Sequence, residues 1–365
     1  MLKSALRLLL LACCALTTSH SSASHLVGGD LRVEHVNDNI YEIILTTYFD
    51  EINGAQQAID SEVLVSIFSK TTNELLGSYQ IPLASDIPIE NNLSCNDNLL
   101  QYRVITYKRS ITLEYQSFND EQGFYLSWER CCRQYSLNNI FSEDPNSGGI
   151  SSGFTAYCEI PSIVYQNSSP KFTTPSEVFG CVDLEFQVDV SATDQDGDSL
   201  VYSLVTPYST VDTENAIPIN PNPGPYPEVV WRDGFDNDNV FGSSSDINFN
   251  SVDGVLTIDA ASTGTFAYAI KCEEYRDGIK IGEVRLDMSL LIVSACTNMD
   301  TSNPDLFAFL TNSKDALLDN QTIEVTSSDQ IQLDVKIIDV PTINESAQEV
   351  GVKARIKSYY DNTVQ

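Results

Sequence analysis

The sequence predicts an all-β protein made of tandem Ig-like or cadherin-like β-sandwich domains. Short runs in which apolar and polar residues alternate recur along the 365 residues, and clusters of Asn, Asp, Gly, Ser and Pro separate them. No stretch shows a sustained helical period with a capping signal at both ends. Hydrophobic residues make up 42% of the chain, so it can bury real cores, and its length suggests two or three domains.

Residues 1–23 have the order of a secretory signal peptide. Lys3 and Arg7 precede an apolar run over residues 8–16, and small polar residues follow as far as Ala23. That run is shorter than the roughly 20 apolar residues that span a bilayer, and no other segment is apolar enough to do so. We therefore expect cleavage near Ala23 and a secreted, extracellular protein without a transmembrane segment. The alternative is a lipoprotein whose acylated N-terminus is Cys13.

The first predicted sandwich occupies residues 24–165. Its strands are expected at residues 41–48, 63–68, 75–81, 102–113 and 124–132. Within the last of these, Leu126 and Trp128 have the same parity, so both are expected to point into the core. Residues 165–170 are polar and end in a proline, which is typical of an interdomain linker.

The second predicted sandwich occupies residues 166–297. Its strands are expected at residues 184–190, 200–204, 255–258, 264–274 and 281–293. The segment 217–227 is too rich in proline for a central strand and is expected to cross the surface before Trp231. Residues 298–365 alternate again but are few for a whole sandwich, so we expect a partial or truncated third β domain.

Seven cysteines remain after removal of the signal peptide, and in an oxidising compartment most of them should be paired. They are Cys95, Cys131, Cys132, Cys158, Cys181, Cys272 and Cys296. Cys131 and Cys132 are adjacent in an expected strand, so they should point to opposite faces and reach two different partners. A disulfide between Cys181 and Cys272 would join the two sheets of the second sandwich, although connectivity cannot be deduced from the sequence.

The strongest candidate for a binding site is the acidic stretch that precedes the strand at residues 200–204. Asp194, Asp196 and Asp198 stand at alternate positions around Gly197. Carboxylates two residues apart can converge on one side of a loop, and hard oxygen ligands suit Ca²⁺. The simpler interpretation is a solvated turn, because turns favour Asp and Gly in any case. The spacing does not fit an EF-hand loop, in which the glycine comes later.

The charge of the chain narrows the choice of partners. Its 51 acidic and 20 basic residues give a net charge of −31, which disfavours nucleic acid because binding it requires a basic face. Zinc is disfavoured as well, since the sequence has no Cys-x-x-Cys pair and contains 3 histidines, of which the signal peptide removes one.

Several short motifs in one order resemble a known family. They are Ser24 to Leu31, Tyr41 to Ile43, Tyr48 to Asp50, Arg130 to Arg133, Asn138 to Ile140, Asn167 to Pro170, Asp194 to Leu204, Tyr226 to Trp231, Gly254 to Leu256, Cys272 to Gly278 and Cys296. Together they make residues 24–297 similar to the N-terminal region of large secreted Bacteroidota surface proteins of the gliding-motility-associated, type IX secretion kind, which carry PKD-like or cadherin-like repeats.

The resemblance implies a non-enzymatic cell-surface protein, a structural or adhesive module stiffened by calcium and disulfides. It implies a cell-surface or extracellular matrix or polysaccharide partner, and secretion machinery that reads a C-terminal sorting domain absent from these residues. It also implies calcium at Asp194, Asp196 and Asp198, to which Glu273 and Glu274 could add ligands. Relatives commonly have a cysteine where this chain has Glu51, so Cys95 is the candidate for the cysteine left unpaired.

An enzyme is disfavoured because the sequence shows no nucleophile elbow, P-loop, HExxH or dinucleotide glycine pattern. The alternative function is a carbohydrate-binding accessory region of a larger secreted enzyme. Trp128 and Trp231, together with Tyr125 and Tyr226, could form a face on which sugars stack. Burial in the core is the competing explanation for such residues, and it is favoured for Trp128.

Overall fold

The computed structural model describes residues 26–52, 54, 59–89, 102–135, 137–143, 148–174, 179–182, 184–213 and 221–294, and the backbone of four short strands between residues 308 and 335. The predicted signal peptide, Cys13, Cys95 and Cys296 lie outside the described residues. The chain divides into two compact units, one of residues 1–90 and 98–295 and the other of residues 91–97 and 296–365.

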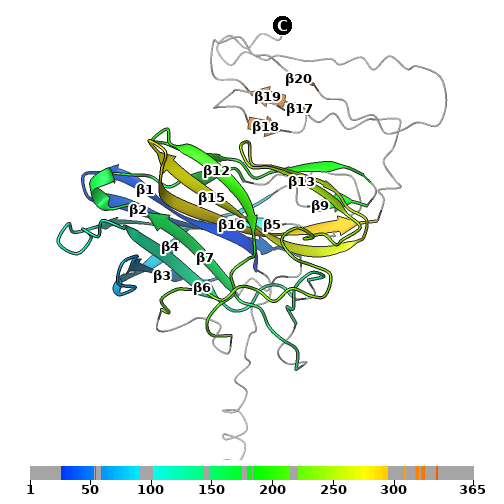
Figure 1. Cartoon of the computed structure of the whole chain (residues 1–365), viewed down its shortest axis with the longest axis horizontal. Coiled ribbons are helices and arrows are strands. Elements are labelled where there is room, and N and C mark those ends of the chain that lie inside the picture. The colour runs from blue at the N-terminus through cyan, green and yellow to red at the C-terminus, as the bar shows by residue number, and fades with distance from the viewer. Residues whose placement is uncertain are drawn as a thin grey trace, which may run out of the picture. The chain divides into compact units, whose positions relative to one another are not determined.

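The predicted all-β class is confirmed, because the described part of the first unit consists of strands, connecting loops and the short 3-10 helix η3 (Ile163–Tyr165) (Figure 1). The first strands are β1 (Leu26–Asn37), β2 (Ile40–Asp50), β3 (Glu62–Ser69), β4 (Leu75–Pro88), β5 (Tyr102–Thr112), β6 (Phe124–Arg130) and β7 (Phe154–Ile160). They are followed by β8 (Lys171–Phe172), β9 (Phe179–Cys181), β10 (Phe186–Asp189), β11 (Ala192–Thr193) and β12 (Ser199–Val205). The last strands of this unit are β13 (Asp246–Asn250), β14 (Val255–Asp259), β15 (Gly264–Arg276) and β16 (Ile279–Val293). Every strand predicted between residues 41 and 293 has an observed counterpart.

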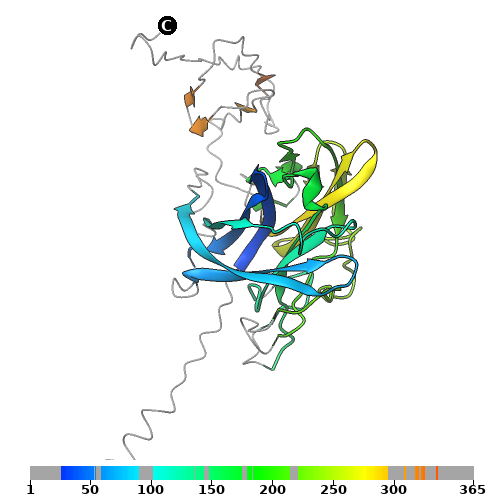
Figure 2. The same cartoon turned by 90° about the vertical axis from the view of Figure 1, so that its left-hand side faces the viewer.

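Eleven strands form one sheet in the order β1-β2-β5-β4-β3-β6-β7-β16-β15-β12, with β9 added alongside β16. Because β1 also pairs with β16, the first eight of these strands follow one another around a closed circuit of pairings. Strand β16 is long enough to pair along one edge with β7, then β1, then β9, while β15 runs along its other edge. The long hairpin of β3 and β4, light blue in Figure 2, curves along one side of the unit.

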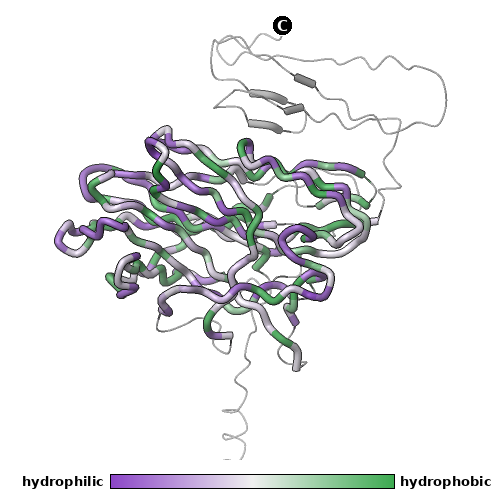
Figure 3. The backbone as a smooth tube through the Cα atoms, viewed as in Figure 1, coloured by the Kyte–Doolittle hydropathy of each residue, from purple (hydrophilic) through white to green (hydrophobic). Residues whose placement is uncertain are grey.

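The boundary expected at residues 165/166 does not separate two compact units. The separate sheet β10-β14-β13 contributes Val188 to the same hydrophobic cluster as Leu31 and Trp128 of the first predicted sandwich and Ile270 of the second. Hydrophobic and hydrophilic stretches interchange along these strands, as the tube in Figure 3 shows. Strands from both predicted sandwiches therefore share one core, and β9, β12, β15 and β16 belong to the same sheet as β1 to β7.

The polar segment taken for a linker is in fact bonded to β1. The amide of Ser169 donates to the carbonyl of Val33 at 2.7 Å, and the Ser168 hydroxyl accepts from the amide of His35 at 3.1 Å. Asn167, Ser168 and Ser169 are each buried, with at most 3% of their surface exposed. The polar groups of this segment form hydrogen bonds inside the protein. Its polar composition therefore led to the wrong expectation that the segment is exposed to solvent.

The second unit contains β17 (Ala308–Phe309), β18 (Leu317–Asp319), β19 (Thr322–Glu324) and β20 (Asp334–Val335). Strand β17 pairs with β20 and β18 pairs with β19, both antiparallel. The third domain expected at residues 298–365 falls in this unit, and most of it lies outside the described residues.

The cysteines differ from expectation. Cys131 and Cys132 are bonded to each other across a cis peptide with their Cα atoms 2.9 Å apart, because β6 ends at Arg130 and neither cysteine is in an alternating strand. Among the described residues, Cys181 and Cys272 have no disulfide partner. Cys181 lies opposite Val293 of β16 and Cys272 opposite Val284, nine residues away, so roughly 30 Å of strand separates them. A disulfide needs Cα atoms within about 7 Å.

The aromatic residues proposed for sugar stacking are largely buried. Trp128 is 6% exposed and packs in the main core, as its parity predicted, while Tyr125 is 5% exposed and Tyr226 is 6% exposed. The Tyr226 hydroxyl donates to Ser127 at 2.7 Å, inside a cluster with Phe68. Three of the four rings therefore offer no face to a saccharide, and the fourth, Trp231, is half-buried.

A buried ion pair links the motif around the cysteines to β16. Arg133 is 1% exposed, and its Nη1 lies 2.6 Å from Oδ1 of Asp287 while its Nη2 contacts Oδ2. The same guanidinium donates to the carbonyls of Gly153 at 2.7 Å and Tyr208 at 2.8 Å. Fully satisfied buried pairs of this kind fix the relative positions of the segments they join.

Candidate metal centre

The loop between β11 and β12 is folded around the side chain of Asp194. Its Oδ1 accepts the backbone amides of Asp196 at 3.0 Å and Asp198 at 2.8 Å, which is the local bonding that aspartate provides in turns. Gly197 has φ of +85°, a conformation that favours glycine. This turn places the carboxylates of Asp196 and Asp198 on the same side as that of Asp194.

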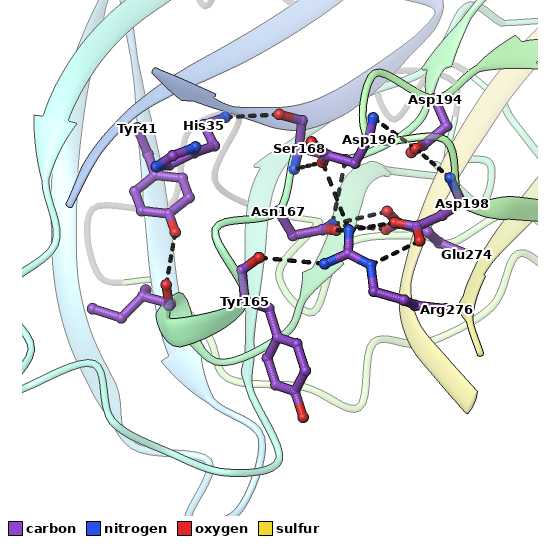
Figure 4. Close-up of polar contacts among 11 residues, drawn as sticks. His35, Tyr41, Tyr165, Asn167, Ser168, Asp194, Asp196, Asp198, Glu274 and Arg276 are labelled. Carbon is purple, nitrogen blue, oxygen red and sulfur yellow. Dashed lines mark hydrogen bonds and ion pairs between the residues drawn. The ribbon is translucent and has the colours of Figure 1, made fainter. Parts of the chain in front are cut away.

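The segment that was expected to be a linker forms one wall of the site. The amide of Ser168 donates to Oδ2 of Asp196 at 2.6 Å, which holds the loop against residues 167 and 168 (Figure 4). Asn167 points its amide between the loop and β15, where Nδ2 lies 2.9 and 3.0 Å from the two oxygens of Glu274.

Glu274 supplies a fourth carboxylate from β15. It pairs with Leu200 of β12 on one side and Gly282 of β16 on the other, and its residue exposure is 0%. A Cβ at position 282 would lie 2.8 Å from Oε2 of Glu274 and 2.8 Å from the carbonyl of Glu159, so glycine at this position makes room for the carboxylate. Each of Asp194, Asp196, Asp198 and Glu274 contributes one oxygen to a group in which all are within 4.8 Å of one another.

Without a cation, the buried Glu274 carboxyl keeps its proton at neutral pH. Burial, reinforced by the nearby Asp194 and Asp198, raises the pKa of the Glu274 carboxyl to about 9, although the Asn167 amide opposes that rise. The Oδ2 atom of Asp194 is buried and finds no hydrogen-bond partner among the described residues. Asp198 behaves differently, because its hydrogen bonds with Arg276 lower the pKa of its carboxyl.

Arg276, the last residue of β15, brings a positive side chain to the cluster. Its Nε lies 2.8 Å from Oδ1 of Asp198 and its Nη2 lies 2.5 Å from Oδ2. The same Nη2 donates to Oδ1 of Asn167 at 2.6 Å and lies 3.9 Å from Oδ2 of Asp196. Figure 4 shows the guanidinium inserted between Asn167 and the acidic loop.

The donor set fits a hard divalent cation. Calcium takes six to eight oxygen ligands from carboxylates, amide carbonyls and water, and the site offers four carboxylates, beside which Oδ1 of Asn167 accepts from Arg276. The three predicted aspartates are brought together, and their role as calcium ligands remains a prediction.

The two glutamates of β15 that were expected as possible further ligands, Glu273 and Glu274, point to opposite faces of the strand. Glu274 joins the cluster, whereas Glu273 points to the opposite face and bonds Lys271 at 3.0 Å and Lys280 at 2.9 Å. Asn167 and Arg276 were not predicted to belong to the site. The available signal was that both belong to the motifs on which the family resemblance rests.

No protein-family model and no curated protein matches the chain. Among solved structures, a chimeric titin Z1Z2-Z1Z2 tandem is 10% identical, with 73% of this chain and 98% of that chain covered and a TM-score of 0.20. Extracellular domains 3–5 of Drosophila OTK are 8% identical, with 76% of this chain and 66% of that chain covered and a TM-score of 0.17. Scores this low do not establish a shared fold, so the fold class rests on the strands described above. The described residues contain no helix both long and apolar enough to cross a membrane.

Proposed function

We propose that this chain is a non-enzymatic extracellular module of a cell-surface protein, structural or adhesive in role, and that one calcium ion at Asp194, Asp196, Asp198 and Glu274 stiffens it. The observation that carries the proposal is a completely buried carboxyl group, that of Glu274, placed beside three other carboxylates, among them Asp194, whose buried Oδ2 has no hydrogen-bond partner among the described residues. Burial and repulsion among the carboxylates make Glu274 hold a proton at neutral pH, and a divalent cation would replace that proton and bring the four carboxylates into coordination.

The ion would act as a cross-link between three segments. Asp194, Asp196 and Asp198 come from the loop before β12, Glu274 comes from β15, and Asn167 comes from the segment bonded to β1. Strand β12 is the last in the order of the large sheet, with β15 as its neighbour there. Calcium would therefore fasten the end of the sheet, which is the part of a sheet most easily detached, to its centre.

The burial of Glu274 favours a structural role over catalysis. Glu274 is 0% exposed and the Asn167 amide and the neighbouring strands enclose it, so a substrate has no route to a carboxylate pair that includes it. The carbohydrate-binding alternative loses support because the rings of Trp128, Tyr125 and Tyr226 are buried. The resemblance of residues 24–297 to secreted Bacteroidota surface proteins supports an extracellular location and a cell-surface or polysaccharide partner.

The test is the thermal unfolding of the purified protein in excess Ca²⁺ and in excess EDTA. A ligand that binds only the folded state at a hundred times its dissociation constant adds about 2.7 kcal/mol to the free energy of unfolding, which raises the Tm by several degrees in a protein of this size. We expect that rise in the wild-type protein. Equal melting temperatures in both solutions would overturn the calcium site.

A matched pair of substitutions locates the ion. Asp194→Asn keeps the Oδ1 atom that accepts two backbone amides but removes the charge at Oδ2, so it should abolish the calcium-dependent rise in Tm. Asp236→Asn is the control, because Oδ1 of Asp236 likewise accepts two backbone amides, those of Asp238 and Asn239, in an exposed turn outside the cluster. A calcium response that survives Asp194→Asn would place the ion elsewhere.

A further inference from the structure

The site already contains a cation that belongs to the protein. The guanidinium of Arg276 occupies both carboxylate oxygens of Asp198 and also bonds Oδ1 of Asn167. Its Nη1 donates to the carbonyl of Tyr165 at 3.3 Å, so four acceptors orient it. The Arg276 side chain is 29% exposed while that of Asp198 is 5% exposed, so the guanidinium reaches into the cluster from the solvent side.

This cation neutralises only part of the cluster. Arg276 is bonded to Asp198, whereas the buried Oδ2 atom of Asp194 has no hydrogen-bond donor assigned to it among the described residues, and Glu274 accepts the uncharged Asn167 amide and interacts with the side chains of Asp194 and Asp198. The buried Oδ2 atom of Asp194 and the buried Glu274 carboxyl could together bind a second cation, and this evidence is separate from the number of acidic residues in the loop. An ion placed there would complete its coordination with oxygens of Asp198 or Asn167, which the guanidinium holds.

We propose that Arg276 is a built-in competitor that weakens calcium binding, so that the site responds to changes in extracellular calcium instead of holding the ion permanently. The inference rests on the calcium site proposed above. The guanidinium and the ion are both positive and draw on the same oxygens, so each lowers the affinity of the site for the other. Calcium binding would require Arg276 to release at least one oxygen and swing toward the solvent.

Competition predicts opposite effects of one substitution in two states. Replacing Arg276 by glutamine removes a bidentate ion pair, which should lower the Tm in EDTA. The same change frees the Asp198 oxygens and removes a repelling charge, which should lower the Kd for Ca²⁺ by at least about tenfold, since like charges at contact distance repel appreciably even in water. An arginine that merely supports the fold would, when removed, weaken the protein in both states and would not tighten calcium binding.

The experiment is isothermal titration of the purified protein with CaCl₂, for the wild type, Arg276→Gln and Arg232→Gln. Arg232 is the matched control, because it also joins a carboxylate, Glu143 at 2.9 Å, and a carbonyl, that of Ile140 at 3.0 Å, away from the cluster. We expect a Kd at least tenfold lower for Arg276→Gln and an unchanged Kd for Arg232→Gln. If Arg276→Gln fails to fold, Arg276→Lys replaces it, since one ammonium cannot hold both Asp198 oxygens and should give a smaller gain in affinity.

The possible outcomes separate the two proposals. If the wild type binds calcium and Arg276→Gln binds with equal or lower affinity, the competitor role is overturned while the calcium site stands. If neither protein binds calcium, the calcium site is overturned and the competitor role with it. A gain in affinity that also appears in Arg232→Gln would reflect net charge alone and would likewise overturn the role of Arg276.

Discussion

Neutralising Asp30 should stabilise this protein at neutral pH. Asp30 lies in β1 where that strand pairs with β2 on one side and β16 on the other, opposite Thr46 and Leu286. It is 5% exposed, and burial raises the pKa of its carboxyl from 3.8 to about 6 despite the opposing charges of Arg32 and Lys171. In this position the desolvation of the carboxylate outweighs its attraction to the two cations, so ionised Asp30 destabilises the folded state.

The magnitude follows from the difference between the folded and unfolded pKa values. A pKa that is higher in the folded protein means that folding is favoured at low pH, and the advantage is lost as the pH rises between about 4 and 6. The shift from 3.8 to about 6 is about two units at about 1.4 kcal/mol each, so ionised Asp30 costs about 3 kcal/mol at pH 7. Asp30→Asn, which resembles the protonated acid, should recover most of this at pH 7 and little of it at pH 4.

Urea denaturation at pH 4 and pH 7 measures this difference. Asp287→Asn provides the contrast, because Asp287 is buried to 4% exposure but is bonded to Arg133. Neutralising it leaves a buried guanidinium without its partner and should cost about 3–5 kcal/mol at pH 7. An Asp30→Asn protein that is no more stable than the wild type at pH 7, or a gain that is equally large at pH 4, would show that ionised Asp30 does not destabilise the folded state.

Two further predictions concern the surroundings of the candidate metal centre. Gly282→Ala should lower the free energy of unfolding by about 1–3 kcal/mol in urea, because its Cβ would lie 2.8 Å from both Glu274 Oε2 and the Glu159 carbonyl; an unchanged midpoint would contradict that packing. Cys158 and Cys272 should react with iodoacetamide only after denaturation, because both are 0% exposed and burial raises the pKa of each thiol. Labelling of either cysteine in the native protein, detected by mass spectrometry, would show that the strands around it open.

Strand positions were predictable because their signal is local. Alternation with a period of two reports which residues face an interior, and it located β2, β3, β5, β12, β14, β15 and β16 to within a few residues. Pairing between strands is not local. Strand β16 pairs with β7, β1 and β9 in turn along one edge. These partners are more than a hundred residues away in the sequence, so local alternation does not predict the pairings. The sequence therefore could not show whether the strands before and after residues 165/166 form separate sandwiches or pair with each other.

The candidate metal centre shows the same limit residue by residue. The alternate spacing of Asp194, Asp196 and Asp198 sufficed to predict that their carboxylates converge, because a tight turn acts over a few residues. Glu274 and Glu273 are neighbours of equal charge, and only the register of β15 against β12 and β16 decides that one enters the cluster and the other pairs with lysines.

The sequence by itself determined the all-β class, the positions of the strands, the acidic turn and the inward direction of Trp128, since each depends on the order of neighbouring residues. Only the tertiary structure decided that the polar segment at residues 167–169 is buried against β1, that Cys131 bonds Cys132, and that Arg276 stands among the carboxylates. Hydrogen bonds and ion pairs are satisfied by whichever groups the fold brings within about 3 Å. The composition shows which polar and charged groups need a bonding partner, and the packing of distant strands determines which partner each group has.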